Sequence, residues 1–130
     1  MRLTPNQACD ILRRIDHGRV YLGRPLGLRD SALLALIAAG LSAVNVANLK
    51  ASDIDIIAGR VTATVAVHDG GTQNFTLSGS GGTRLLAWIH HRRLWGTTAP
   101  VFTGHQGVPY TSRAISAVLD RYRSKRKKAR

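Results

Sequence analysis

The sequence predicts an α+β fold, a mainly helical domain that carries a small three-stranded antiparallel sheet. Three observations lead to this prediction. Apolar residues recur with helical spacing towards both ends of the chain, and a Val- and Thr-rich alternating stretch occupies residues 60–67. A hairpin turn signal, Asp-Gly-Gly, then follows at residues 69–71. The expected order is helices, a three-stranded meander, and helices again.

The first helix is expected to begin at Thr4, because the Thr-Pro-Asn-Gln that starts there has the pattern of a capping box. Gly18 is expected to end this helix. Cys9 lies among its apolar positions and is expected in the core. Residues 19–27 contain two glycines and a proline and are expected to be a connection.

A second helix is expected to begin at Arg29 or Asp30 and to end near residue 39, before Gly40. Its apolar run, residues 32–41, is far shorter than the roughly 20 residues that span a bilayer. We therefore expect a buried core helix and no membrane partner. A short third helix is expected at about residues 43–48.

Residues 52–57 are expected to lead into the first strand of the sheet, and residues 58–59 to form its turn. The alternating stretch at residues 60–67 is the second strand, and residues 72–77 return as the third. Residues 78–82 are polar and glycine-rich and are expected to form a link to the next helix.

Two helices are expected in the last third of the chain. The first is indicated by Leu85, Trp88 and Ile89, and it is expected to end near Trp95. Residues 100–102 have the composition of a short strand, and residues 104–109 that of a loop. Thr111 is expected to cap the last helix, whose apolar stripe consists of Ile115, Val118, Leu119 and Tyr122.

The charge of the chain indicates a polyanionic partner. It has 19 basic and 7 acidic residues, a net charge of +12, and 15 of the basic residues are Arg, which grips phosphate with a planar fork. We expect one domain, residues 1–123, followed by a basic tail, residues 124–130. The basic residues at this end of the chain are Arg121, Arg123, Lys125, Arg126, Lys127, Lys128 and Arg130.

A lone cysteine excludes an internal disulfide and agrees with a reducing compartment. The five histidines are scattered along the chain, so no metal site and no cofactor are expected. The expected location is the cytoplasm, in association with the nucleoid.

Three stretches, residues 29–41, 49–55 and 107–115, resemble tyrosine recombinases, the phage-integrase family. The resemblance covers about residues 25–123 and implies a truncated form of the family's catalytic domain. It places residues 29–41 at the helix that delivers the first catalytic arginine. It places residues 107–115 at the loop and helix that precede the family's His-x-x-Arg box.

The sequence departs from the family at the residues that the resemblance makes catalytic. Ser42 stands at the position of the first arginine, and Asn45 at that of an acidic residue. Asp69 falls near the position of the hairpin lysine, and the sequence ends before the His-x-x-Arg box and the nucleophilic tyrosine. Removing one electrostatic group typically lowers the rate of an enzyme by about 10²–10³. We therefore expect no strand cleavage and no enzymatic activity.

A His-x-x-Arg pattern and two tyrosines elsewhere in the sequence could also be interpreted as catalytic. Residues 90–93 read His-His-Arg-Arg and formally contain His-x-x-Arg, but they lie ahead of residues 107–115, so we interpret them as a solvated basic face. Tyr110 lies in a loop, and Tyr122 completes an apolar stripe. Neither tyrosine is expected to be a nucleophile.

The resemblance implies that the helix beginning at Thr111 faces double-stranded DNA, where a helix N-terminus offers free N–H groups to phosphate. Lys50 is a candidate for contact with backbone phosphate. Arg92 and Arg93 form a second basic patch, whose orientation the sequence does not indicate. The candidate DNA-binding residues are Ser42, Asn45, Lys50, Arg92, Arg93, Thr111, Ser112, Arg113, Arg121, Arg123, Lys125, Arg126, Lys127 and Lys128.

Three functions remain open from the sequence. The leading hypothesis is a non-catalytic DNA-binding protein, sequence-dependent or architectural, that acts as a transcription regulator or as an accessory factor of a mobile element. The second is a fragment of a strand-exchange recombinase completed by another polypeptide. The third is a protein-interaction module that docks on another protein or on a second copy of itself.

Overall fold

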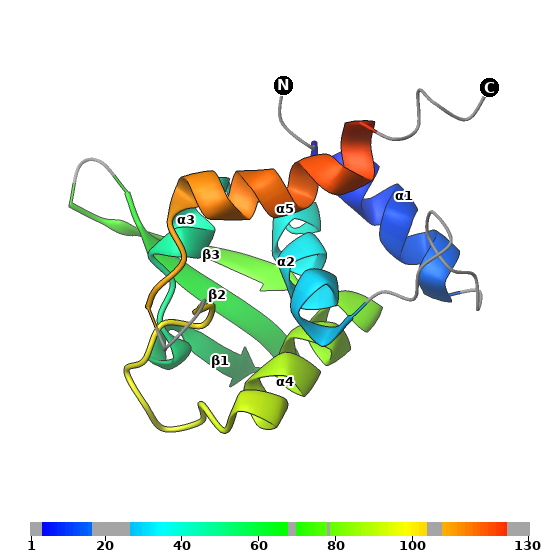
Figure 1. The fold of residues 1–130 in the computed structure, drawn as a ribbon. Coiled ribbons are helices and arrows are strands. Elements are labelled where there is room, and N and C mark those ends of the chain that lie inside the picture. The colour runs from blue at the N-terminus through cyan, green and yellow to red at the C-terminus, as the bar shows by residue number, and fades with distance from the viewer. Residues whose placement is uncertain (1–3, 17–26, 68–69, 78, 104–107, 125–130) are drawn as a thin grey trace.

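The structure is a computed structural model that describes residues 4–16, 27–67, 70–77, 79–103 and 108–124. Helix α2 (Leu28–Ala38) occupies its centre, and the helices α1 (Pro5–Asp16), α4 (Ser80–Arg92) and α5 (Ser112–Ser124) pack around it (Figure 1). All seven residues from position 31 to 37 of α2 are buried, which confirms the predicted core helix.

The sheet is the predicted three-stranded antiparallel meander, in the order β1 (Ile54–Ile57), β2 (Arg60–Ala66) and β3 (Thr72–Leu77). Its register pairs Ile54 with Ala63, and Ala63 with Phe75, on the face that packs against the helices. The α+β fold class predicted from the sequence is confirmed.

The capping box of α1 is present: the amide of Thr4 donates to the side chain of Gln7 at 2.9 Å, and the amide of Gln7 donates to Thr4 at 3.1 Å. The expectation that Cys9 lies in the core is wrong, because its side chain is exposed. The buried stripe of α1 contains Ala8, Ile11 and Leu12, and Cys9 is about 100° around the helix from Ala8.

Helix α4 begins within the segment that was expected to be a link. Ser80, Gly81 and Gly82 already belong to the helix, and Gly82 is buried. A Cβ at Gly82 would lie 3.0 Å from Cγ2 of Val61, so glycine lets the first turn of α4 lie directly on the sheet. Tertiary packing here overrides the low helix propensity of glycine.

The short helix α3 (Ala43–Ala47) and the 3₁₀ helix η1 (Ala51–Asp53) connect α2 to the sheet. The predicted apolar stripe of α5 is buried at Ile115, Val118 and Leu119, whereas the side chain of Tyr122 lies outside the described residues. In the described part of the chain, no helix is long and apolar enough to cross a membrane.

Candidate nucleic-acid interface

Ser42 and Asn45 form a reciprocal cap at the start of α3. The amide of Asn45 donates to Oγ of Ser42 at 3.2 Å, and the amide of Ser42 donates to Oδ1 of Asn45 at 3.2 Å. Both side chains are half-buried. The two residues that were predicted to contact DNA are therefore already partners of each other, and their side chains satisfy the free amides of the helix terminus.

Lys50 is exposed and borders a cavity of about 300 Å³ between the segment after α3 and strand β2. Asn45 also lines this cavity, so the structure brings these two predicted residues together. Asp53 lines it as well and accepts a hydrogen bond of 3.0 Å from the amide of Lys50. The cavity therefore carries both signs of charge, and the Asp53 carboxylate opposes close approach of a phosphate.

The N-terminus of α5 is capped by Thr111, as predicted: its Oγ1 accepts a hydrogen bond of 3.1 Å from the amide of Ala114. Arg113 is exposed and Ser112 is half-buried. Helix α5 packs on α3, so its first turn lies near the cap formed by Ser42 and Asn45 (Figure 1). The structure thus places the predicted residues of α3 and α5 on one side of the molecule.

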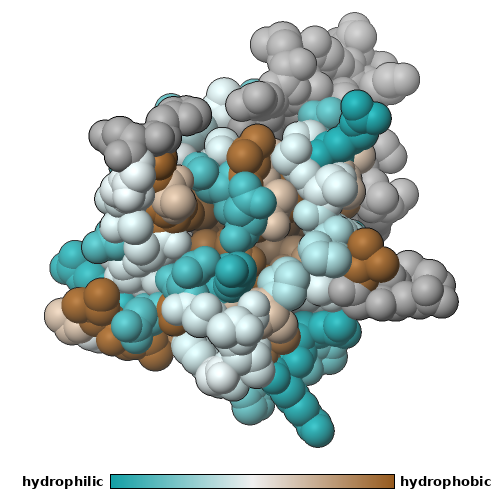
Figure 2. Space-filling model, turned by 90° about the vertical axis from the view of Figure 1, so that its left-hand side faces the viewer, coloured by the Kyte–Doolittle hydropathy of each residue, from teal (hydrophilic) through white to brown (hydrophobic). Residues whose placement is uncertain are grey.

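Figure 2 looks onto this side, the left-hand side of Figure 1, which includes the β2–β3 hairpin and the first turn of α5. Hydrophilic residues and residues of intermediate hydropathy cover most of it, with a few hydrophobic ones between them. We call the residues Ser42, Asn45, Lys50, Thr111, Ser112 and Arg113 the α3–α5 face.

The segment that enters α5 is fixed by a contact that the sequence did not predict. Nη1 of Arg29 donates a hydrogen bond of 2.7 Å to the hydroxyl of Tyr110, and Nε of Arg29 contacts Oδ1 of Asp30 at 2.9 Å. Burial acts to lower the pKa of Arg29, but the hydrogen bonds and charges of Asp30 and Tyr110 outweigh it and raise that pKa. Arg29 is therefore a permanent cation that ties the start of α2 to the start of α5.

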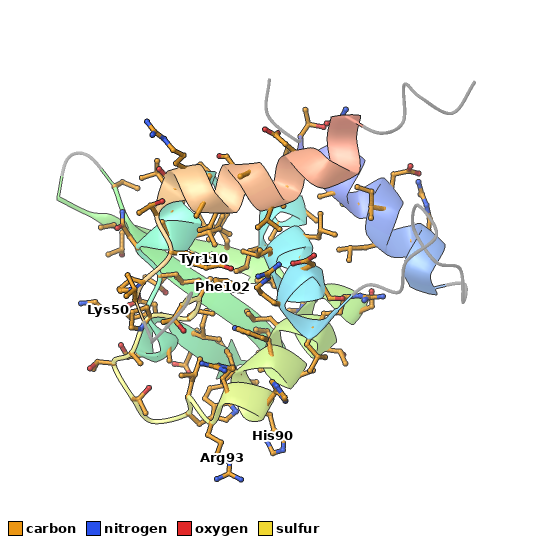
Figure 3. All side chains as sticks on the ribbon, in the orientation of Figure 1. Lys50, His90, Arg93, Phe102 and Tyr110 are labelled. Carbon is orange, nitrogen blue, oxygen red and sulfur yellow. The ribbon has the colours of Figure 1, made fainter. Side chains whose placement is uncertain are left out.

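Arg92 and Arg93 lie apart from the α3–α5 face. They are exposed at the C-terminal end of α4, and Figure 3 shows Arg93 and His90 directed away from the body at the end of the molecule opposite α5. The guanidinium of Arg92 lies 5.7 Å from the ring centroid of Trp88. The structure thus shows these residues exposed and apart from the α3–α5 face, and it supplies the orientation that the sequence left open.

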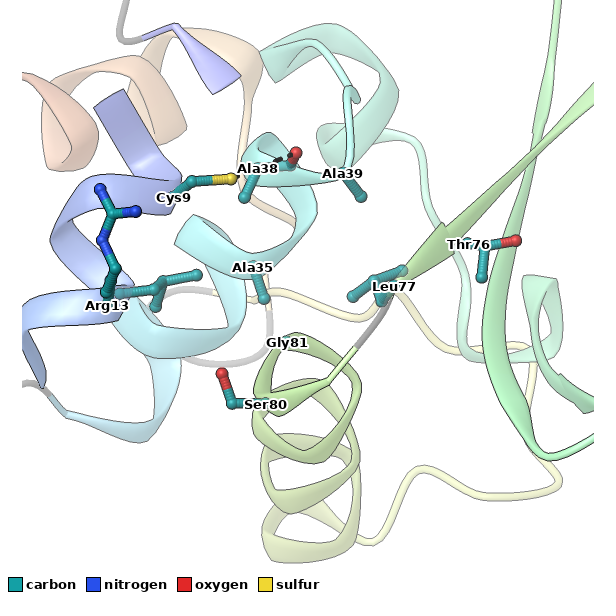
Figure 4. Close-up of a pocket in the computed structure, with 10 residues that line it drawn as sticks. Cys9, Arg13, Ala35, Ala38, Ala39, Thr76, Leu77, Ser80 and Gly81 are labelled. Atoms are coloured by element: carbon teal, nitrogen blue, oxygen red, sulfur yellow. Dashed lines mark hydrogen bonds between the residues drawn. The ribbon is translucent and has the colours of Figure 1, made fainter. Parts of the chain in front are cut away.

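A second cavity, of about 330 Å³, lies between α1, α2, the end of β3 and the start of α4 (Figure 4). Its polar lining residues are Cys9, Arg13, Thr76 and Ser80. The thiol of Cys9 is 3.9 Å from the carbonyl oxygen of Ala38. No sequence pattern signals this cavity, because its lining comes from four separate elements.

Several predicted positions lie outside the described residues. These are Asp69, the side chains of Arg121 and Arg123, and the tail residues Lys125, Arg126, Lys127 and Lys128. Within the described ranges, no three His, Cys or Asp side chains are grouped closely enough to hold a metal ion.

Comparisons with known proteins find solved structures with a similar fold but no significant match by sequence. No protein-family model matches the chain, and no curated protein matches it significantly. The chain is similar to the crystal structure of XerA recombinase, with a TM-score of 0.71 and 16% identity over 100% of this chain and 44% of that one.

It is also similar to the XerH site-specific recombinase, solved with its difH substrate in a pre-cleavage complex. The TM-score is 0.53 and the identity 17%, over 85% of this chain and 32% of that one. The chain thus spans less than half the length of either recombinase. Identity at this level establishes the fold alone, and the fold of this chain is that of part of a tyrosine recombinase.

Proposed function

We propose that this chain binds double-stranded DNA through the α3–α5 face and does not cut it. The observation that carries the proposal is the cap formed by Ser42 and Asn45. The family resemblance puts the first catalytic arginine at Ser42, and here that position holds a short neutral side chain engaged with the helix terminus. A phosphorane-like transition state would meet no cation there.

The charge distribution supports the binding part of the proposal. The sequence from residue 70 to residue 119 contains no acidic residue, and this stretch supplies the first turn of α5. That turn presents helix amides, the Thr111 hydroxyl and the exposed guanidinium of Arg113, all of which suit phosphate oxygens. XerH, one of the recombinases with the same fold, was solved with its difH substrate.

The role that follows is that of a transcription regulator or an accessory factor of a mobile element, associated with the nucleoid. It would hold duplex DNA by phosphate contacts, supplemented by a few base edges. The fragment of a recombinase is the second candidate, because the chain spans 44% of XerA. Ser42 argues against it, because completing the chain with another polypeptide would not restore an arginine at this position.

Titration of a labelled duplex by fluorescence anisotropy over a range of salt concentrations tests the proposal. Arg113→Ala should weaken binding and flatten the log–log salt dependence by about 0.9, the value of one phosphate contact. Arg13→Ala removes the same charge from α1, away from the α3–α5 face, and should leave the slope unchanged.

A duplex with a trapping nick tests the part of the proposal that excludes cleavage. Any covalent protein–DNA adduct on this duplex would overturn that part and favour the recombinase fragment. The absence of duplex binding at moderate salt would overturn both interpretations.

A further inference from the structure

The C-terminal end of α4 has a cluster of cationic and aromatic groups that the α3–α5 face does not use. His90, His91, Arg92 and Arg93 follow one another and are all exposed, and Trp95 beyond them is 45% exposed. None of the residues 70–119 is acidic. Within the described residues, neither Arg92 nor Arg93 forms an ion pair or a side-chain hydrogen bond with another residue. We call these five residues the α4 patch.

Arg92 has a cation–π partner within its own helix. Its guanidinium stacks 5.7 Å from the ring centroid of Trp88, and Trp88 is itself anchored by a hydrogen bond of 2.8 Å from Nε1 to the carbonyl of Val101. Phe102 also stacks on Trp88, with the two ring centroids 5.8 Å apart. An arginine whose rotamers are restricted by such a cation–π contact loses less side-chain entropy on binding, and the contact leaves its N–H groups available as donors.

Arg93 occupies a backbone conformation that favours glycine. It follows the last residue of α4 with φ 56° and ψ 48°, the left-handed position where helices commonly place glycine. The sequence keeps a long cation at this strained position, although the described residues offer its guanidinium no partner. Retained strain of this kind is common where a side chain serves a binding site.

The chemistry of the patch fits the phosphate backbone of DNA. Two arginine forks and neighbouring imidazoles suit phosphate oxygens, and an exposed indole adds a flat apolar surface. Arg93 and His90 lie at the end of the molecule opposite α5 (Figure 3), so the patch and the first turn of α5 face different directions. From this placement we infer that one straight duplex on the α3–α5 face leaves the patch open.

We propose that the α4 patch binds a second DNA duplex, so that one molecule bridges two DNA segments. This inference rests on the proposed function, because the first duplex is the one held by the α3–α5 face. It gives the chain an architectural role that a single DNA contact would not provide.

The test is a capture assay. One duplex is immobilised on beads, and a second, labelled duplex is retained only when the protein links the two. The double variant R92A/R93A should reduce capture by about tenfold or more, because it removes two phosphate-binding side chains. Its affinity for a single duplex, measured by anisotropy, should change by less than about twofold, as expected for independent sites. Arg13→Ala is the charge control and should change neither measurement.

The outcomes are distinguishable. Single-duplex binding without capture by the wild-type chain, or equal capture by R92A/R93A, would overturn the bridging inference and leave the proposed function standing. A parallel loss of single-duplex affinity in R92A/R93A would assign the patch to the first interface and also overturn it. No binding of any duplex by the wild-type chain would overturn the proposed function itself. Circular dichroism melts of each variant show that the folded state is retained.

Discussion

Arg29 and Tyr110, 81 positions apart in the sequence, are joined by a hydrogen bond of 2.7 Å from the guanidinium Nη1 to the tyrosine hydroxyl. Arg29 is the second residue of α2, and Tyr110 stands two residues before the first residue of α5. The bond therefore connects the central helix to the segment that aims the first turn of α5. The α3–α5 face depends on this connection, because Thr111 follows Tyr110 directly and Arg113 lies two residues further on.

Tyr110→Phe removes the hydroxyl and leaves a partly buried cation with one fewer partner. We expect a loss of about 1–2 kcal/mol in the free energy of unfolding, measured by urea denaturation. Val108→Ala, in the same segment and 61% exposed, is the control and should stay within about 0.5 kcal/mol of the wild type. Equal stability of Tyr110→Phe and the wild type would show that the bond contributes nothing.

The cap on α3 gives a second prediction. Ser42→Ala removes the acceptor for the amide of Asn45 and should lower the free energy of unfolding by about 1 kcal/mol. Ser112→Ala is the matched control, because Ser112 lies inside the first turn of α5, where Thr111 already provides the cap. If both alanine variants unfold at the same urea concentration, Ser42 has no capping role.

Two adjacent glycines at the start of α4 should respond to the same substitution with opposite signs. A Cβ at Gly82 would meet Val61 Cγ2 at 3.0 Å and the backbone oxygen of Leu77 at 3.3 Å, so Gly82→Ala should destabilise the protein by about 1–3 kcal/mol.

At Gly81 the added Cβ would lie 3.7 Å from Cβ of Ala35, an ordinary contact. Gly81→Ala should therefore stabilise the protein by about 0.5 kcal/mol through its higher helix propensity. Thermal melts of both variants provide the measurement. Destabilisation by both would mean that neither position 81 nor position 82 tolerates a side chain.

The sequence predicted those parts of the fold that depend on local patterns. The capping box at Thr4, the buried run of α2 and the meander all follow from spacing and turn chemistry, and all are present. The start of α4 lies earlier than predicted. Gly82 packs so closely on the sheet that a Cβ there would lie 3.0 Å from Val61 Cγ2, and no local sequence pattern signals such packing.

In the candidate site, too, the features set by local patterns could be predicted and those set by tertiary packing could not. Thr111 was identified as a cap because the pattern around it is local, and the capping box that Ser42 forms with Asn45 has the same spacing. At Ser42, the family resemblance indicated a missing catalytic arginine and not a helix cap. The Arg29–Tyr110 bond depends on how two distant segments pack together, and the α4 patch depends on which way the end of a helix faces. The sequence contains no signal for the Arg29–Tyr110 bond, and it indicates the basic residues of the α4 patch but not their orientation.

The basic tail is predicted to add affinity without selectivity. Deleting residues 124–130 removes five basic side chains, so binding to all duplex sequences should weaken alike. The log–log salt slope should fall by about 0.9 for every phosphate that the tail neutralises. A chain of equal length with glutamine at the basic positions separates charge from length. An unchanged slope in the deletion variant would remove the tail from the interface.

Arg93→Gly separates the stability of the α4 patch from its function. Glycine adopts the left-handed conformation without the Cβ clash, so this variant should be more stable than the wild type by about 1 kcal/mol. Ala58, with φ 53° in the turn between β1 and β2, is the matched control, because Ala58→Gly relieves the same kind of strain without removing a charge.

Both glycine variants should therefore raise the melting temperature, but only Arg93→Gly should reduce the capture of a second duplex. If Arg93 had a purely structural role, its substitution would lower the stability of the protein and its DNA capture together. Retention of full capture by the stabilised Arg93→Gly would show that the arginine at this strained position does not serve the second DNA contact.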